Sequence, residues 1–273
     1  TSTNSSIGLI YALKKIFMKS IFIEAGINHF GNLKEANYIL SYFLKSKFTN
    51  LTFMLHTKEF YNSQKKRGIN FKLTKNFYIS AIKKCHQKNK KLGLAVCQKD
   101  TFNELLDLKF DFYKLLSVGI NQSDLVKELQ KKKKPIYIST GLKVTDQEIK
   151  KCLKIFKSKN KLYLLHTPMT YNISELNLNR INYLKKKFNI KTGYSNHNND
   201  KESLNVVSSH KPECLFLYCK SKRKKGRIYP DDKHAFFLDE LEEISYKYFQ
   251  YLNINKKLNK IKKINIFKNE FKF

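Results

Sequence analysis

Residues 21–31 read IFIEAGINHFG, an apolar run that ends on a carboxylate, a glycine turn, an amide and an imidazole. Residues 21–23 predict a short buried strand, because β-branched and aromatic side chains suit a pleated surface that is covered on both faces. Residues 32–47 then carry apolar side chains at helical spacing, so a helix should follow the polar turn. Glu24 thus lies at the carboxyl end of a strand, where (β/α) enzymes present their chemistry.

The same unit repeats along the chain. Further strands are predicted at residues 51–55, 92–97, 110–116, 135–138, 162–165, 190–194 and 214–219. Helical segments are predicted at residues 76–88, from 101, at 121–130, from 145, at 176–188, 202–209 and 238–251. Ser123 is expected to cap one of these helices, and Thr145 with Glu148 has the spacing of a capping box. Residues 58–73 are expected to form a loop folded over one end of the sheet.

Polar residues gather at or just past the predicted strand ends. They are Glu24, His56, Ser117, Ser139, His166, Ser195 and His197. Strict alternation of strands and helices fits a closed barrel or an open doubly wound sheet, but a closed barrel brings all these ends to one mouth. We therefore predict a single-domain (β/α)8 TIM barrel over residues 19–251. A poorly ordered leader is expected at residues 1–18 and a basic tail at residues 252–273.

Composition limits the possible partners. The 54 Lys and Arg residues against 22 Asp and Glu give a formal charge of +32. This charge favours an anionic partner, but the lysines are scattered through every predicted helix, which is typical of solvated faces, so nucleic acid is not expected as a partner. The five cysteines include no CxxC pair and indicate reduced thiols in a cytoplasmic protein. No apolar run is long enough to span a bilayer, so a membrane is not expected either.

Four stretches, in order and at matching spacing, resemble the N-acetylneuraminate (sialic acid) synthase family. They are IEAGINHFG at 23–31, YKLLS at 113–117 with KPIYISTG at 134–141, LLHTPMTY at 164–171 with GYSNH at 193–197, and YPDDK at 229–233. The resemblance implies a (β/α)8 barrel that condenses phosphoenolpyruvate with an N-acylated hexosamine. The product would be a nonulosonic acid, a sugar of the sialic acid type, and phosphate would be released.

By this resemblance, particular residues take particular roles. Lys114, Ser117, Ser139 and Ser195 would hold phosphoenolpyruvate, with Tyr171 also binding substrate. Glu24 and one of Asp231 or Asp232 match groups on the sugar side that handle protons. His197 matches one of two histidines that hold a divalent metal, Mn or Mg, which polarises the sugar aldehyde.

The chain also departs from the family pattern. The second metal histidine is missing from the stretch that ends in Lys220, and we hypothesise that the Lys220 ammonium takes the place of the metal. Thr52 and Met54 stand where the family has lysine and glutamine, Val96 replaces a threonine, and Met169 replaces an asparagine. The family's C-terminal antifreeze-like module, which helps to complete the sugar site across a dimer, is also expected to be absent.

These departures keep alternatives open. The first reading is an active synthase, and the second is a catalytically degenerate barrel that binds a sugar, a phosphorylated ligand or a protein partner. Nucleic-acid binding would be recognised by a steep salt dependence. His197 is open between a metal ligand and a hydrogen-bonded structural histidine. The sequence also leaves open a homodimer and a separate chain that supplies the missing module.

Overall fold

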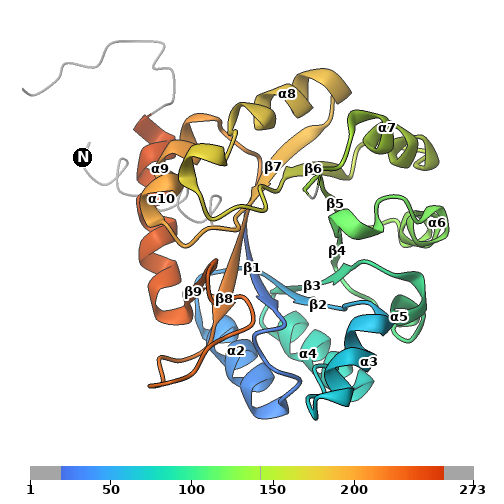
Figure 1. Ribbon diagram of the computed structural model, residues 1–273, viewed down its shortest axis with the longest axis vertical. Coiled ribbons are helices and arrows are strands. Elements are labelled where there is room, and N and C mark those ends of the chain that lie inside the picture. The colour runs from blue at the N-terminus through green and yellow to red at the C-terminus, as the bar shows by residue number, and fades with distance from the viewer. Residues whose placement is uncertain (1–19, 142, 255–273) are drawn as a thin grey trace, which may run out of the picture.

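The computed structural model describes residues 20–141 and 143–254. The predicted leader, residues 1–18, lies outside this part of the chain, as does most of the predicted tail. Eight parallel strands stand at the centre, and helices surround them in a ring (Figure 1). The last described helix ends at Ile254 and so continues past residue 251.

The strands close into a barrel. They are β1 (Ile21–Gly26), β2 (Asn50–Met54), β3 (Lys91–Val96), β4 (Phe112–Leu115), β5 (Ile136–Ser139), β6 (Leu162–His166), β7 (Lys191–Ser195) and β8 (Leu215–Lys220). Each pairs in parallel with the next, and β1 also pairs in parallel with β8. This last pairing excludes the open sheet and confirms the predicted (β/α)8 barrel.

The helices cover the outside of the barrel. They are α2 (Leu33–Lys45), α3 (Lys58–Lys66), α4 (Lys75–Gln87), α5 (Lys99–Asn103), α6 (Ser123–Lys131), α7 (Asp146–Ile155), α8 (Asn179–Phe188), α9 (Lys201–Ser209) and α10 (Leu241–Ile254). Short 3₁₀ turns lie at Ser117–Gly119, Ile173–Glu175 and Leu238–Glu240. Of the helices in the described residues, none is long and apolar enough to cross a membrane.

Two local predictions are wrong and one is confirmed. The predicted loop at residues 58–73 contains α3, which Thr57 caps by accepting a hydrogen bond from the Phe60 N–H at 3.2 Å. Ser123 does not cap α6, because it is already the first helical residue. Gln122 holds the cap position, and its side chain makes no capping hydrogen bond. The capping box of Thr145 and Glu148 at the start of α7 is present.

Aromatic side chains fill the barrel below its mouth. The Phe22 ring stacks on Phe216 with centroids 4.4 Å apart and meets Phe112 edge-on at 5.0 Å. Gly93 on β3 makes room for this cluster, because a Cβ there would lie 2.1 Å from the Phe112 ring. The filled interior leaves the carboxyl ends of the strands as the place where a ligand can enter.

A ninth strand, absent from the sequence prediction, follows the barrel. β9 (Ala235–Phe237) pairs in parallel with β8, with Tyr218 opposite Ala235. Because β9 lies beside the end of β8, the loop that precedes it returns to the mouth. Asp231 and His234 reach the site through this loop.

Candidate active site

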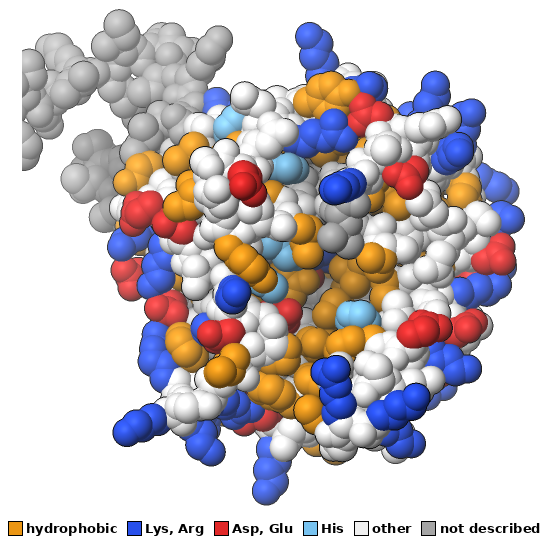
Figure 2. All heavy atoms as spheres, in the orientation of Figure 1, with side chains coloured by type: hydrophobic (Ala, Val, Ile, Leu, Met, Phe, Trp, Pro, Cys, Tyr) orange, Lys and Arg blue, Asp and Glu red, His pale blue; other side chains and the backbone are white. Residues whose placement is uncertain are grey.

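A cavity of about 220 Å³ opens at the mouth of the barrel. Figure 2 shows a hollow at the centre of this face, bordered by histidine and hydrophobic side chains, with lysines around the periphery. Its polar lining residues include His56, Lys114, Ser117, Ser139, Thr167, His197, Tyr218, Asp231 and His234. They come from several βα units, and five of the residues predicted for the site are among them: Lys114, Ser117, Ser139, His197 and Asp231.

The Lys114 side chain is the buried positive charge of the cavity. Its Nζ donates to Oε2 of Glu24 at 2.6 Å and to Oγ of Ser195 at 2.9 Å. Burial raises the pKa of Glu24 and lowers the pKa of Lys114, and the attraction between the two charges opposes both shifts. Ser195 and Glu24 therefore lie behind Lys114 and hold its ammonium in place, while Lys114 lines the cavity.

Two serine hydroxyls lie beside the lysine. Ser117 Oγ accepts a hydrogen bond from the Gly141 N–H at 2.8 Å, so its own proton is free for another acceptor. Ser139 Oγ is buried, and no described residue forms a hydrogen bond with it. A buried hydroxyl without a partner costs free energy, so this one is placed for a bound acceptor.

Another part of the cavity lining carries two imidazoles and a carboxyl group. The rings of His197 and His234 lie with centroids 5.0 Å apart, and Tyr218 contacts both. Burial lowers the pKa of His234 to about 4, with contributions from Lys114 and Lys220, so the ring is neutral at neutral pH. Burial also raises the pKa of Asp231 to about 7, against the opposing hydrogen bond from the Ile27 N–H.

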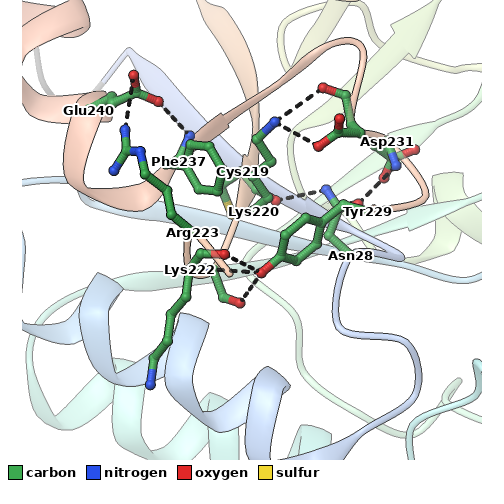
Figure 3. Close-up of polar contacts among 11 residues, drawn as sticks. Asn28, Cys219, Lys220, Lys222, Arg223, Tyr229, Asp231, Phe237 and Glu240 are labelled. Atoms are coloured by element: carbon green, nitrogen blue, oxygen red, sulfur yellow. Dashed lines mark hydrogen bonds and ion pairs between the residues drawn. The ribbon is translucent and has the colours of Figure 1, made fainter. Parts of the chain in front are cut away.

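The loop between β8 and β9 places this wall. Asn28 donates to the Cys219 carbonyl at 2.8 Å, and its Oδ1 accepts from the Asp231 N–H at 2.9 Å (Figure 3). The Tyr229 hydroxyl accepts from the Lys222 N–H and donates to the Lys222 carbonyl. The asparagine of the opening motif thus fixes Asp231 from the far end of the chain.

Besides Glu24 and Ser195, three more predicted site residues lie outside the cavity lining. The Lys220 ammonium pairs with Oδ1 of Asp232 at 2.8 Å and lies over the Phe237 ring at 4.4 Å (Figure 3). Tyr171 is 57% exposed and stacks loosely on His234 with centroids 6.3 Å apart. The geometry thus gives the roles predicted for Lys220, Asp232 and Tyr171 no direct support, and they stay predictions.

His234 lines the cavity but is not among the site residues predicted from the sequence. The motif that resembles the family ends at Lys233, one residue earlier. Two features of the sequence pointed to His234. It directly follows that motif, and the chain lacks the family's second metal histidine on β8. Its ring could be placed only by the pairing of β9 with β8.

Part of the cavity is apolar. Met54, Cys97, Leu116, Val118 and Met169 line it. Met54 and Met169 are two of the positions where the sequence departs from the family, and burial raises the pKa of the Cys97 thiol to about 12, which leaves it protonated and unreactive. One wall is therefore suited to the apolar parts of a ligand.

Comparison with known protein families identifies the family of the chain. The model of the NeuB family matches residues 17–209, which is most of the chain. The chain belongs to the NeuB family. This confirms the resemblance that the four motifs indicated.

Individual NeuB-family relatives and solved structures agree. A pseudaminic acid synthase of Campylobacter jejuni is 38% identical over 89 residues, which are 31% of this chain and 26% of that protein. The chain thus matches about a quarter of that relative's length. An N-acetylneuraminic acid synthetase from Leptospira borgpetersenii superposes with a TM-score of 0.78 at 21% identity, over 90% of this chain and 88% of that one. A truncated form of 3-deoxy-D-arabino-heptulosonate 7-phosphate synthase from Thermotoga maritima shares the fold at a TM-score of 0.64 and 9% identity, over 86% and 88% of the two chains.

The divalent metal expected from the resemblance finds a limited set of ligands here. Within residues 20–141 and 143–254, no three His, Cys, Asp or Glu side chains are grouped so that they could hold a metal ion. His234 nevertheless has a buried Nδ1 without a hydrogen-bond partner among the described residues. A buried nitrogen of this kind would be available as a metal ligand.

Proposed function

We propose that this chain condenses phosphoenolpyruvate with an N-acylated hexosamine to give a nonulosonic acid and inorganic phosphate. The observation that carries the proposal is the meeting of Lys114, Ser117 and Ser139 at one cavity in the barrel mouth. Membership of the NeuB family supports this reaction class. The proposal places the reaction in the cytoplasm, consistent with five free, buried cysteines.

The donor set matches the charges of phosphoenolpyruvate. Its phosphate and carboxylate oxygens need hydrogen-bond donors and a cation that are held in place before the ligand arrives. Lys114 is held by Glu24 and Ser195, while the hydroxyl protons of Ser117 and Ser139 remain available. These three side chains would bind the anion and fix the direction of its vinyl carbon.

The wall with Asp231 would face the sugar. In the proposed reaction the vinyl carbon attacks the aldehyde carbon, water adds to the resulting cation, and phosphate leaves. When bound, a divalent metal would supply Lewis-acid polarisation of the aldehyde oxygen. The Asp231 carboxyl accepts from the Ile27 N–H at 3.5 Å, and Asn28 accepts from the Asp231 backbone N–H. This carboxyl would hold or give the proton that the oxygen takes up.

The apolar wall supports a second candidate function. Met54 and Met169 replace amide side chains expected from the family, and a barrel that has lost such contacts could bind a sugar or a phosphorylated ligand without turnover. The two candidates share the anion site and differ in chemistry. Binding of phosphoenolpyruvate without release of phosphate would favour the second.

The test is phosphate release from phosphoenolpyruvate by the purified chain. Candidate N-acylated hexosamines are added one at a time, with and without Mn²⁺. Release that depends on both substrates supports the synthase. Silence across the panel, together with calorimetric binding of phosphoenolpyruvate, would assign the non-catalytic role. Sedimentation in the same buffer would test whether the chain forms a homodimer, which the sequence leaves open.

A further inference from the structure

Two histidines from different parts of the chain face each other across the cavity wall. His197 follows β7, and His234 directly precedes β9. Their ring centroids are 5.0 Å apart, with ring planes inclined by 32°. Both side chains are buried and both line the cavity.

The hydrogen bonds of each ring indicate which nitrogen is available. Nδ1 of His197 lies 3.1 Å from the Ser195 carbonyl oxygen and donates to it, which leaves Nε2 with its lone pair. Nε2 of His234 lies 3.5 Å from Oδ1 of Asp231, and its Nδ1 is buried without a hydrogen-bond partner among the described residues. Metal-bound histidines commonly donate their second ring nitrogen to a carbonyl or a carboxylate. His197 has this arrangement, and Nε2 of His234 lies within ion-pair distance of the Asp231 carboxylate.

The ring separation also fits a shared ion. Two imidazoles that bind one metal at about 2.0–2.2 Å, with an angle of about 90–110° between them, place their ring centroids about 4.5–5.2 Å apart. The observed separation of 5.0 Å falls within this range. The two rings are therefore spaced to bind one ion.

We propose that His234 supplies the second imidazole ligand of a divalent-metal site whose first ligand is His197. Strand β8 lacks the second metal histidine of the family. His234 would supply that imidazole from the loop before β9, which lies next to β8 because Tyr218 pairs with Ala235. The Asp231 carboxylate lies 3.5 Å from the other ring nitrogen of His234, Nε2. The inference deepens the proposed function, because the ion would lie in the cavity assigned to the sugar.

The site offers few protein ligands. Because the described residues include no group of three potential ligands, the remaining coordination positions belong to water and to substrate oxygens. Such an open site suits a catalytic ion better than a structural one. The competing reading, in which the Lys220 ammonium replaces the metal, is less well supported, since Lys220 is already paired with Asp232.

The test uses the purified full chain with Mn²⁺ alone and counts coordinated nitrogens by pulsed electron paramagnetic resonance. The wild-type chain is expected to bind one Mn²⁺ with two imidazole nitrogens. His234→Ala and His197→Ala should each lose one nitrogen and bind at least about tenfold more weakly, and Asp231→Asn about 10–100-fold more weakly. His86→Ala, a change at a partly exposed histidine that pairs with Asp111, is the matched control and should leave binding unchanged.

Each of these measurements supports or overturns the proposed metal site. Absence of stoichiometric Mn²⁺ binding, or one histidine nitrogen in the wild-type chain, overturns the proposal, and the wild-type count holds even if a variant fails to fold. Retention of full affinity by a folded His234→Ala chain overturns it as well. Because neither phosphoenolpyruvate nor sugar is present, failure of the synthase assay and failure of this site would be distinguished.

Discussion

The Lys114 ammonium and the Glu24 carboxylate form an ion pair at 2.6 Å, with 1% and 2% of their side chains exposed. The pair joins β4 to β1 across the barrel, beside the cavity. Two opposite charges removed from water stabilise each other only while both are present, because either alone would be a buried, uncompensated charge. The anion site therefore depends on a contact that the fold must also maintain.

Removal of one partner should be worse than removal of both. Lys114→Met is expected to lower the free energy of unfolding by about 3–5 kcal/mol, and the double variant Lys114→Met with Glu24→Gln by clearly less. Urea unfolding of the two single variants and the double variant at neutral pH measures this. Strictly additive losses would contradict the interpretation of the contact as a coupled buried pair.

Ser139→Ala should separate stability from binding. The Ser139 hydroxyl is buried without a partner among the described residues, so its removal is expected to change the free energy of unfolding by less than about 0.5 kcal/mol or to raise it. Affinity for phosphoenolpyruvate should nevertheless fall about tenfold, because one donor is lost. Calorimetry and urea unfolding on the same samples check both halves. Unchanged affinity would remove Ser139 from the anion site.

His29 should make the protein sensitive to acid. Burial lowers its pKa to about 4, and its Nδ1 accepts the Gly31 N–H at 2.9 Å, so the folded chain resists protonation there. Below the ordinary value of 6.5 the unfolded chain takes up the proton first, so this contribution to stability is complete above that pH and is lost as the pH falls towards 4. The loss should reach about 3 kcal/mol at pH 4.

The matched variant for this effect is His29→Asn, which retains an acceptor for Gly31 without a titratable ring. The difference in unfolding free energy between wild type and variant should shift in favour of the variant as the pH is lowered from 7 to 4. Urea midpoints at several pH values measure it. Parallel pH profiles for the two chains would show that His29 is not the group responsible.

Gly93 should tolerate no side chain while Phe112 remains. A Cβ at residue 93 would lie 2.1 Å from the Phe112 ring, inside the packed barrel, so Gly93→Ala is expected to cost about 1–3 kcal/mol or more. Phe112→Leu in the same chain should relieve part of that cost, because the ring atoms in conflict are removed. Thermal unfolding of Gly93→Ala, Phe112→Leu and the double variant completes a double-mutant cycle. An equal cost of Gly93→Ala with and without Phe112→Leu would contradict this prediction.

Local patterns predicted most of the fold. The eight strands appear where alternating units of apolar runs and helical spacing placed them, since each run needs cover on both faces whatever its neighbours are. The helix α3 was missed because its charged sequence has no buried face: the structure gives it no buried residues. Its helical state follows from the Thr57 cap and not from an apolar stripe.

The sequence by itself determined the barrel, the family and the gathering of Lys114 and Ser139 at one mouth, because strand ends in a closed parallel barrel meet there regardless of side-chain detail. Only the tertiary structure decided which loop residues face the cavity. Lys220 turns to Asp232, while His234 turns to His197, because Asn28 and the pairing of β9 with β8 set the path of the intervening loop. These contacts join distant parts of the chain, and no local pattern carries them.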